Sequence, residues 1–295
     1  MRLATIKLNG EETAALVVSG GAAPISGINT ELGCDWETDL LTLIKRNRIR
    51  EMTAWYKEAG EGRLTSLKSV IPKEEVLYGP LYRNPQKIFG IGLNYKDHAG
   101  DLAENAPTGI PASFLKPATT IIGCGDAVKI PVQSDQTTGE AELGVIIGAE
   151  CENIEPENWL ECVAGFTAVI DMTAEDILRL NPRYLTYAKS FRTFFSFGPH
   201  LVTPDEVPDV TALVVRTVHN GEIHAQNTVS NMTFPPDFLV SFHSKAFKWS
   251  PGDILSTGTP RAVRIQHGDT IECRIDGFEP LVNGVIDKKV TSCPA

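Results

Sequence analysis

The sequence predicts an α+β protein dominated by β-strands, with a small N-terminal α/β unit over residues 1–80 and a larger unit over residues 85–290. Two observations predict this division. Up to about residue 80, two short strand-like runs precede segments whose apolar residues recur with helical spacing. From about Asn84 onwards, short β-rich runs alternate with turns rich in Gly, Pro and Asn, and few long helices interrupt them.

Short-range patterns define the N-terminal unit. Residues 3–8 and 13–18 are typical of two strands, and Asn9-Gly10 between them is typical of a tight hairpin turn. Residues 39–44 and 52–59 carry the apolar spacing of helices. No side chain in this unit is a persuasive catalytic group, so we interpret it as a packing or dimerisation module.

Strand-like runs define the larger unit, and they cover residues 87–91, 120–122, 143–147, 166–170, 212–218 and 270–275. Turn signals such as Asn220-Gly221 and Pro251-Gly252-Asp253 separate them. Helices are predicted over residues 171–180, with Thr173 as the N-cap, and over residues 237–247. We therefore expect a β-dominated unit that contains few helices.

Composition narrows the class of protein. Of the 295 residues, 42% are hydrophobic and 22% are charged, as in ordinary globular proteins. The net charge of −10 disfavours nucleic acid and anionic lipid as partners, and an anionic substrate would need cations gathered at its site. None of the six cysteines stands in a C-x-x-C pair, which indicates free, mostly buried thiols. Because neither a signal peptide nor a run of roughly 20 apolar residues occurs, we expect a cytoplasmic protein without a membrane partner.

The strongest local signal is a pair of acids at the start of an apolar run. Glu140 and Glu142 precede Leu143-Gly144-Val145-Ile146-Ile147, which reads as a strand. Side chains at positions i and i+2 leave a strand on the same face, so the two carboxylates point the same way. Such a pair repels unless a cation or a proton lies between them, which suggests a site for Mg²⁺ or Mn²⁺. An exposed strand face with ordinary acids is the alternative interpretation.

A second signal is Asp171, which ends the apolar run Phe166-Thr167-Ala168-Val169-Ile170 and precedes the predicted helix. This position places a carboxylate at the end of a strand, where functional sites are commonly built. A helix-capping aspartate is the alternative interpretation.

The order of several weaker segments is more specific than any one of them. In chain order they are Gly92-Leu93-Asn94-Tyr95-Lys96-Asp97-His98, Glu140-Ala141-Glu142-Leu143, Asp171, Lys189-Ser190-Phe191, Gly198-Pro199, Asn220-Gly221-Glu222, Pro251-Gly252-Asp253 and Thr257-Gly258-Thr259-Pro260. This succession resembles the fumarylacetoacetate hydrolase superfamily, in particular its two-domain bacterial-type members. The resemblance covers about residues 85–288 and is looser in the N-terminal unit.

The resemblance implies a mixed β-roll catalytic domain, a homodimer and a bound Mg²⁺ or Mn²⁺. By resemblance the metal ligands would be Glu140, Glu142 and Asp171, and Lys189 would stabilise a developing enolate or oxyanion. His98 would be the general base, carried on a mobile lid. Members often carry a glutamate three residues after this histidine, where the chain has Asp101. Its acidic partner would therefore be Asp101 or the more distant Glu104.

The resemblance also implies substrate contacts at Tyr95 and at Thr259, which looks like a threonine that meets the substrate carboxylate. Near the pocket the chain departs from the common pattern, because Arg192 stands where an aspartate is usual and Arg261 where an alanine is usual. We therefore predict an intact metal set and an altered substrate preference. Arg192 and Arg261 would supply the positive charge that an anionic substrate needs.

These parts imply chemistry on a small anionic 2-oxo acid through a metal-stabilised enolate. The leading hypothesis is hydrolysis of a C–C bond in a 2,4-dioxo acid of the acylpyruvate kind. The alternative is an oxaloacetate decarboxylase or tautomerase, or an isomerase of an unsaturated 2-oxo diacid such as 2-hydroxyhepta-2,4-diene-1,7-dioate. A catalytically silent binding relative is the third hypothesis.

Overall fold

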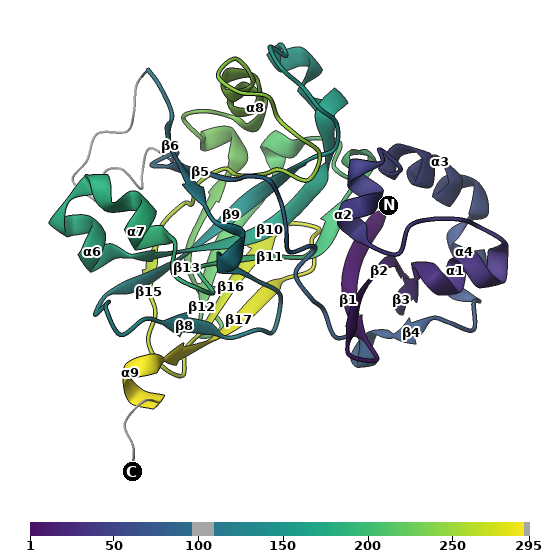
Figure 1. Cartoon of the computed structure of the whole chain (residues 1–295), viewed down its shortest axis with the longest axis horizontal. Helices are drawn as coiled ribbons and strands as arrows, with labels where there is room; N and C mark the ends of the chain where they lie inside the picture. Colours follow the sequence, from purple (N-terminus) through teal and green to yellow (C-terminus); the bar gives the residue numbers. More distant parts are fainter. Residues whose placement is uncertain (96–108, 292–295) are drawn as a thin grey trace.

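Strands dominate the structure, a computed structural model that describes residues 1–95 and 109–291. They form two open sheets, one much larger than the other (Figure 1). The predicted α+β, strand-dominated class is confirmed. In the described part of the chain, no helix combines the length and the apolar character needed to cross a membrane.

The larger sheet runs through both predicted units. Its strands, in spatial order, are β4 (Ile71–Pro72), β3 (Gly21–Pro24), β2 (Glu11–Val18), β1 (Arg2–Leu8), β11 (Phe195–Val202), β10 (Val163–Ala174), β9 (Thr137–Ile147), β14 (Ile254–Ser256), β5 (Ile88–Gly92) and β6 (Ala112–Lys116). Off this path, β15 (Val263–Arg264) pairs with β9, and β7 (Ile121–Ile122) pairs with β11. The runs predicted as strands at residues 87–91, 143–147 and 166–170 fall within or overlap β5, β9 and β10.

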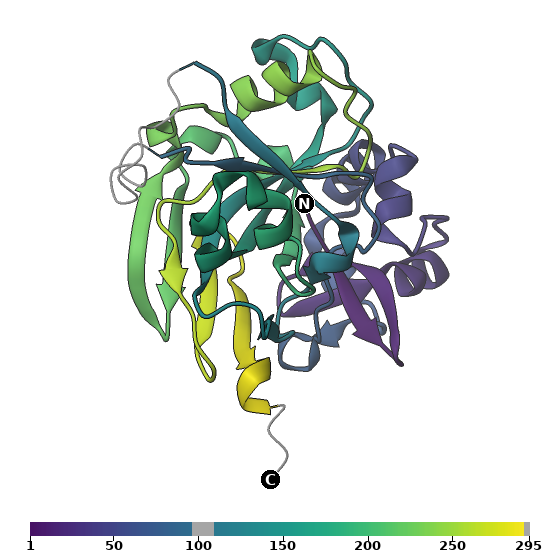
Figure 2. The same ribbon diagram turned by 60° about the vertical axis from the view of Figure 1, so that its left-hand side comes forward.

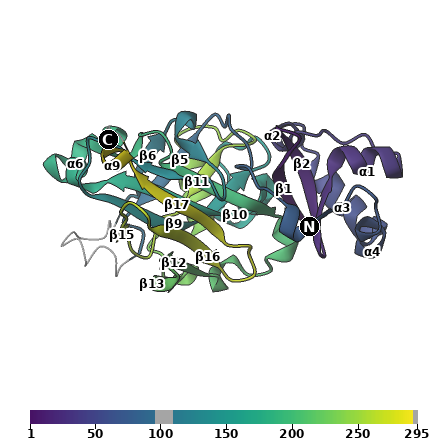
Figure 3. The same cartoon turned by 90° about the horizontal axis from the view of Figure 1, so that it is seen from below.

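The N-terminal strands carry helices of their own at one end of the molecule, as Figure 3 shows. These helices are α1 (Ile25–Leu32), α2 (Leu40–Lys45), α3 (Ile49–Ala59) and α4 (Glu61–Thr65). Antiparallel pairing of β1 with β11, for example Leu3 with Leu201, joins this unit to the rest of the sheet. The domain boundary near residue 80 stays a prediction, and the two predicted units share one sheet and one apolar core cluster.

The hairpin predicted at the N-terminus is confirmed. Asn9 and Gly10 have φ of 52° and 84°, and they connect β1 to β2 in a two-residue turn. Positive φ at both central residues is the geometry of a type I′ turn, whose twist matches that of the flanking strands. The helices predicted over residues 39–44 and 52–59 correspond to α2 and the second part of α3.

The helix predicted over residues 171–180 is wrong at its start. β10 continues through Asp171 to Ala174, and the helix α6 covers only Glu175–Leu180. Thr173 is therefore no N-cap, and the Asp176 carboxylate accepts hydrogen bonds from Ser134 and Asp135. The reason is tertiary, because β9 extends back to Thr137 and pairs with β10 along its whole length.

The smaller sheet packs against β9 and β10 (Figure 2). Its strands, in spatial order, are β13 (Glu222–Thr228), β12 (Val214–His219), β16 (Thr270–Ile275), β17 (Leu281–Asp287) and β8 (Val128–Ile130). The other α-helices of the described residues are α6, α7 (Leu185–Lys189), α8 (Pro236–Ser244) and α9 (Lys288–Thr291). The main core lies between the two sheets, where Val145 and Phe166 meet Val215 and Ile271 in one cluster of buried residues.

Candidate metal centre

Two neighbouring strands bring three carboxylates together. Glu140 and Glu142 occupy positions i and i+2 of β9 and leave it on one face, and Asp171 of β10 lies directly opposite Glu140 in the antiparallel ladder. One carboxylate oxygen of each residue lies within 4.8 Å of those of the other two. Glu142 and Asp171 are each only 1% exposed. The structure therefore gathers the three predicted ligands into an acidic triad, in which Glu140 is partly exposed and the other two are buried.

Two lysines contact this triad. The Nζ of Lys189, at the end of α7, donates to Glu140 Oε2 at 2.9 Å and to Asp171 Oδ2 at 2.6 Å. The Nζ of Lys116, at the end of β6, donates to the other oxygen of Asp171 and to the Met172 carbonyl at 3.1 Å. The Phe114 ring covers Lys189, whose Nζ lies 4.5 Å from the ring centroid.

The two ammonium groups are not equivalent. Burial lowers the pKa of Lys116 to about 8, against the opposing attraction of Asp171, and the neighbouring charge of Lys189 adds to the lowering. Burial would also lower the pKa of Lys189, but Asp171 and Glu140 outweigh it and raise this pKa above its usual value. Lys189 is therefore the more firmly charged of the two.

Neutral donors hold Glu142. The Ser256 hydroxyl donates to its Oε2, and the backbone N–H of Gly258 donates to the same oxygen at 2.8 Å. Gly258 has a φ of +98°, and a Cβ there would lie 2.8 Å from that of Asn94. The chain thus reaches the carboxylate closely because this position carries no side chain.

The donor set fits a hard divalent cation. Burial raises the pKa of Glu142 to about 8, and the charges of Asp171 and Glu140 contribute to the rise. Three carboxylates face two lysine ammonium groups, so a bound cation would offset the negative charge that remains when all three are ionised. Among the described residues, hydrogen bonds engage Oε2 of both glutamates, which leaves their Oε1 atoms as oxygen ligands. The triad could therefore bind Mg²⁺ or Mn²⁺, and nothing in the geometry distinguishes the two.

The four residues predicted to contact substrate lie at different depths. Tyr95 is fully buried, and the charge of nearby Glu142 adds to the effect of burial in raising its pKa. Its hydroxyl has no hydrogen-bond partner among the described residues. Thr259 is buried, and its hydroxyl donates to the Arg261 carbonyl at 3.3 Å. Arg192 and Arg261 are exposed.

The predicted general base His98 and its acidic partners Asp101 and Glu104 lie outside the described residues. Their roles, and the lid predicted around them, stay predictions.

Sequence reasoning missed Lys116 and Ser256. Lys116 follows the short strand-like run Ala112-Ser113-Phe114-Leu115 and precedes a proline, and this position is its local signal. Ser256 stands inside the segment Pro251 to Pro260, which indicated a family resemblance and not a contact to Glu142. Both contacts depend on which strands become neighbours, so local sequence does not encode them.

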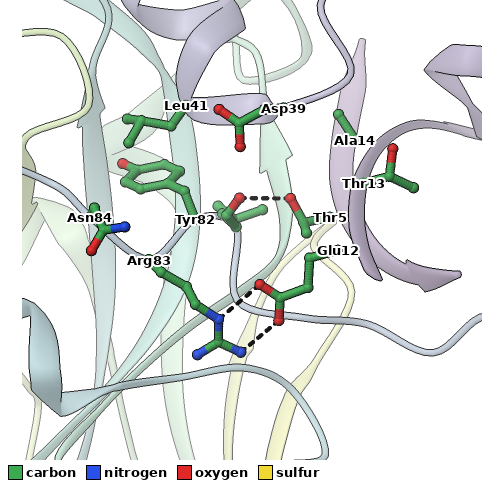
Figure 4. Close-up of a pocket in the computed structure, with 10 residues that line it drawn as sticks. Thr5, Glu12, Thr13, Ala14, Asp39, Leu41, Tyr82, Arg83 and Asn84 are labelled. Carbon is green, nitrogen blue, oxygen red and sulfur yellow. Dashed lines mark hydrogen bonds and ion pairs between the residues drawn. The ribbon is translucent and has the colours of Figure 1, made fainter. Parts of the chain in front are cut away.

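A separate cavity of about 250 Å³ lies where the N-terminal unit meets the rest of the chain (Figure 4). Its lining includes Thr5, Glu12 and Leu41 from the N-terminal unit and Leu81, Tyr82 and Arg83 from the segment that follows it. The Arg83 guanidinium donates to both carboxylate oxygens of Glu12, at 2.8 and 2.5 Å (Figure 4). We call this boundary, including the pairing of β1 with β11, the seam. None of the triad or lysine residues lines the cavity.

Comparisons with known proteins identify the family of this chain. Residues 87–286 match the family model of the fumarylacetoacetate hydrolase C-terminal domain. The mitochondrial oxaloacetate tautomerase fahd2 of Xenopus laevis is 33% identical over 257 residues, which cover 81% of this chain and 78% of that protein.

Solved structures resemble the chain over nearly its whole length. The crystal structure of maleylpyruvate hydrolase from Sphingobium sp. SYK-6 covers 97% of this chain and 100% of its own, with a TM-score of 0.78 and 25% identity. A second structure of that enzyme, in complex with manganese(II) ion and pyruvate, has a TM-score of 0.79, 24% identity, and coverage of 97% and 99%. The family match, the extent of the Xenopus relationship and the shared fold lead to one conclusion: this chain belongs to the fumarylacetoacetate hydrolase family.

Proposed function

We propose that this protein is a divalent-metal-dependent enzyme that interconverts the enol and keto forms of a small anionic 2-oxo acid, with oxaloacetate as the first substrate to test. The observation that carries the proposal is the buried acidic triad with two lysine Nζ atoms against it. The sequence relationship to an oxaloacetate tautomerase, over 81% of the chain, supports this choice of reaction.

Glu140, Glu142 and Asp171 would hold the cation, for which Mg²⁺ and Mn²⁺ are both proposed. When bound, such a cation supplies Lewis-acid stabilisation of an enolate-like oxygen. Ser256 and Gly258 keep Glu142 oriented by donating to its Oε2. Lys189 and Lys116 place positive charge beside the triad, where the negative charge of an enolate would develop.

The remaining site residues complete the proposal. Tyr95 offers a buried hydroxyl without a partner among the described residues. Thr259 is also buried and carries a hydroxyl. Both hydroxyls suit contact with a substrate carboxylate. Arg192 and Arg261 would favour the approach of an anion to a protein of net charge −10. His98 would move the proton at the substrate carbon, with Asp101 or Glu104 as its partner. A homodimer in the cytoplasm remains part of the proposal.

Hydrolysis of a C–C bond in an acylpyruvate-like acid is the second candidate. It is favoured by the likeness to maleylpyruvate hydrolase, which extends over 97% of this chain and includes the N-terminal unit. Both reactions would use the same enolate, so the triad and the lysines do not choose between them. Hydrolysis also requires an activated water, which would be the task of His98.

The deciding experiment follows substrate and products together. Loss of enol-oxaloacetate is monitored by ultraviolet absorbance with Mg²⁺ or Mn²⁺ added, and acylpyruvates and maleylpyruvate are offered separately with products identified by mass spectrometry. We expect metal-dependent enol loss without a change in mass. Two acid fragments from a dioxo acid, with no acceleration of enol loss, would replace the first candidate with the second. Equal rates with metal and with excess chelator would contradict both.

A further inference from the structure

The connection between β9 and β10 brings two cysteines together. The ladder ends with Val163 opposite Ile147, and beyond it the Gly148 N–H donates to the Cys162 carbonyl at 2.7 Å. Three residues after Gly148, Cys151 forms an isolated bridge with Trp249, with N–H to carbonyl distances of 3.3 and 3.0 Å. Both ends of the intervening segment are therefore fixed by backbone hydrogen bonds, and they bear one thiol each.

The two thiols contact each other directly. A hydrogen bond joins the Cys151 and Cys162 side chains. The Cys162 sulfur also lies 3.1 Å from the Trp159 carbonyl, so its single S–H has two acceptors within reach. Cys162 is 2% exposed, whereas Cys151 is partly exposed.

The contact makes the two sulfurs chemically different. The hydrogen bond from Cys162 lowers the pKa of Cys151, against the effect of its burial. The same bond, together with burial, raises the pKa of Cys162. Because the thiolate is the reactive form of cysteine, the partly exposed Cys151 is the more reactive of the pair.

The other described cysteines lack such an arrangement. The Cys124 sulfur lies 3.9 Å from the Pro280 carbonyl, and the buried Cys273 sulfur lies 3.5 Å from the Glu142 carbonyl. Cys34 and Cys124 are partly exposed, as Cys151 is, so they serve as matched controls for simple accessibility.

We propose that Cys151 and Cys162 are a redox-modification site that forms a reversible disulfide with peroxide as the oxidant. The Cys151 sulfur attacks peroxide, which yields a sulfenic acid at Cys151 and one water. The Cys162 sulfur then attacks the Cys151 sulfur, the S–S bond forms, the S–O bond breaks, and the leaving hydroxide takes the Cys162 proton as a second water. The two thiols lose two electrons in total, and the peroxide is reduced by two.

The disulfide would lock a connection that ties the metal-bearing strands to α8. Between the two cysteines lies η3 (Pro156–Cys162), and the Asn153 and Ile154 N–H groups donate to the Ser244 carbonyl and hydroxyl, each at 3.0 Å. Closing this short loop restricts the unfolded chain, so oxidised protein should melt at a higher temperature than reduced protein.

The test uses the full-length protein and hydrogen peroxide. Limited oxidation, alkylation of the remaining thiols with N-ethylmaleimide, proteolysis and mass spectrometry should reveal one cross-linked pair of peptides that contain Cys151 and Cys162. Dithiothreitol should remove the cross-link, and the Cys124→Ser control should retain it. In Cys162→Ser, Cys151 should stop at the sulfenic acid and react with dimedone.

Two outcomes would overturn the proposal. One is oxidised wild-type protein in which Cys151 and Cys162 are alkylated as fast as Cys34 and Cys124. The other is a cross-link from Cys151 to any cysteine besides Cys162. Both are measured on the wild-type chain, so a variant that fails to fold leaves the result decisive.

Discussion

The charged side chains of the metal-bearing ladder and those of the seam differ in how deeply they are buried and how they are paired. In the ladder, Glu142 and Asp171 are almost completely buried, and three carboxylates share two lysines. At the seam, Arg83 and Glu12 form a matched pair whose side chains are 49% and 28% exposed. Unbalanced buried charge costs stability and is kept where it binds or reacts, whereas exposed, matched charge contributes little. We therefore expect the ladder to carry the chemistry and the seam to have a structural role.

The two regions are linked by the pairing of β11 with β10 and also through a turn. Leu41 of α2 packs against Gly252, where an added Cβ would lie 2.3 Å from the Leu41 Cδ1. The turn that contains Gly252 leads into β14, which carries Ser256 and its hydrogen bond to Glu142. The predictions below test whether the ladder and the seam nevertheless behave independently, in order of decreasing effect.

The largest effect is expected from Asp171→Asn, which removes a proposed ligand without changing its size. Metal affinity should fall by more than the roughly 10–100-fold typical of residues that only orient a ligand. The metal-dependent rise in melting temperature should disappear with it. Asp253→Asn is the matched control, because Asp253 is also fully buried and pairs with Lys87 at 2.6 Å. If Asp171→Asn kept the metal-dependent rise in melting temperature, the assignment of the triad as the metal site would be contradicted.

Replacement of the lysines should separate charge from metal binding. Lys189→Met removes the more firmly charged group and should lower kcat by roughly 10²–10³-fold, the usual cost of losing one donor to a developing oxyanion. Lys116→Met should cost less, because burial lowers the pKa of this lysine to about 8. Steady-state kinetics with saturating metal measures both variants. A larger loss in Lys116→Met than in Lys189→Met would reverse the proposed order of the two lysines.

At the seam, His200 should make stability depend on pH. His200 of β11 pairs with Ala4 of β1, and its Nε2 lies 3.1 Å from the Tyr78 hydroxyl. Burial lowers its pKa to about 4. The unfolded chain takes up this proton near pH 6.5, so the folded state loses stability as the pH falls from about 6.5 to about 4. The full loss is on the order of 3 kcal/mol.

Urea unfolding near neutral pH and at about pH 5 measures this loss of stability in the wild-type protein and in His200→Gln. Other groups also titrate in this range, so the informative quantity is the difference between the two proteins. The variant should lose less stability on acidification. Equal losses would show that His200 is not the group responsible.

The smallest effect is expected from Arg83→Ala. Because the Arg83–Glu12 pair is partly exposed, its loss should lower the free energy of unfolding by at most about 1 kcal/mol. Metal-dependent stabilisation and kcat should remain unchanged. Loss of metal binding in this variant would show that the seam reaches the metal centre, and the separation of the two regions would fail.

Local pattern was enough to predict much of the fold and the acids of the site. The spacing of Glu140 and Glu142 defines a common strand face whatever their neighbours are, and Asn9-Gly10 determines its hairpin by backbone preference alone. The end of β10 was missed because Met172, Thr173 and Ala174 suit a strand or a helix equally well. Pairing with β9, which lies far away in sequence, decides between them.

Contacts among distant elements could not be predicted. Lys116 meets Asp171 only because β6 is placed beside β5 at the edge of the sheet and α7 packs against both β6 and β10. The hydrogen bond from Ser256 to Glu142 likewise depends on the pairing of β14 with β9. Such neighbours follow from sheet order, which short sequence windows do not contain.

The pairing of β1 with β11 has a practical consequence for anyone who shortens this protein. A chain that started at residue 85 would lose β1 and leave residues 200–202 of β11 as an unprotected strand edge. The same cut would uncover Phe197 and Leu201, which are fully buried in the cluster shared with the N-terminal unit. Open edges beside newly exposed apolar side chains are templates for self-association. We therefore expect the first 80 residues to protect this edge from self-association, quite apart from any part in catalysis.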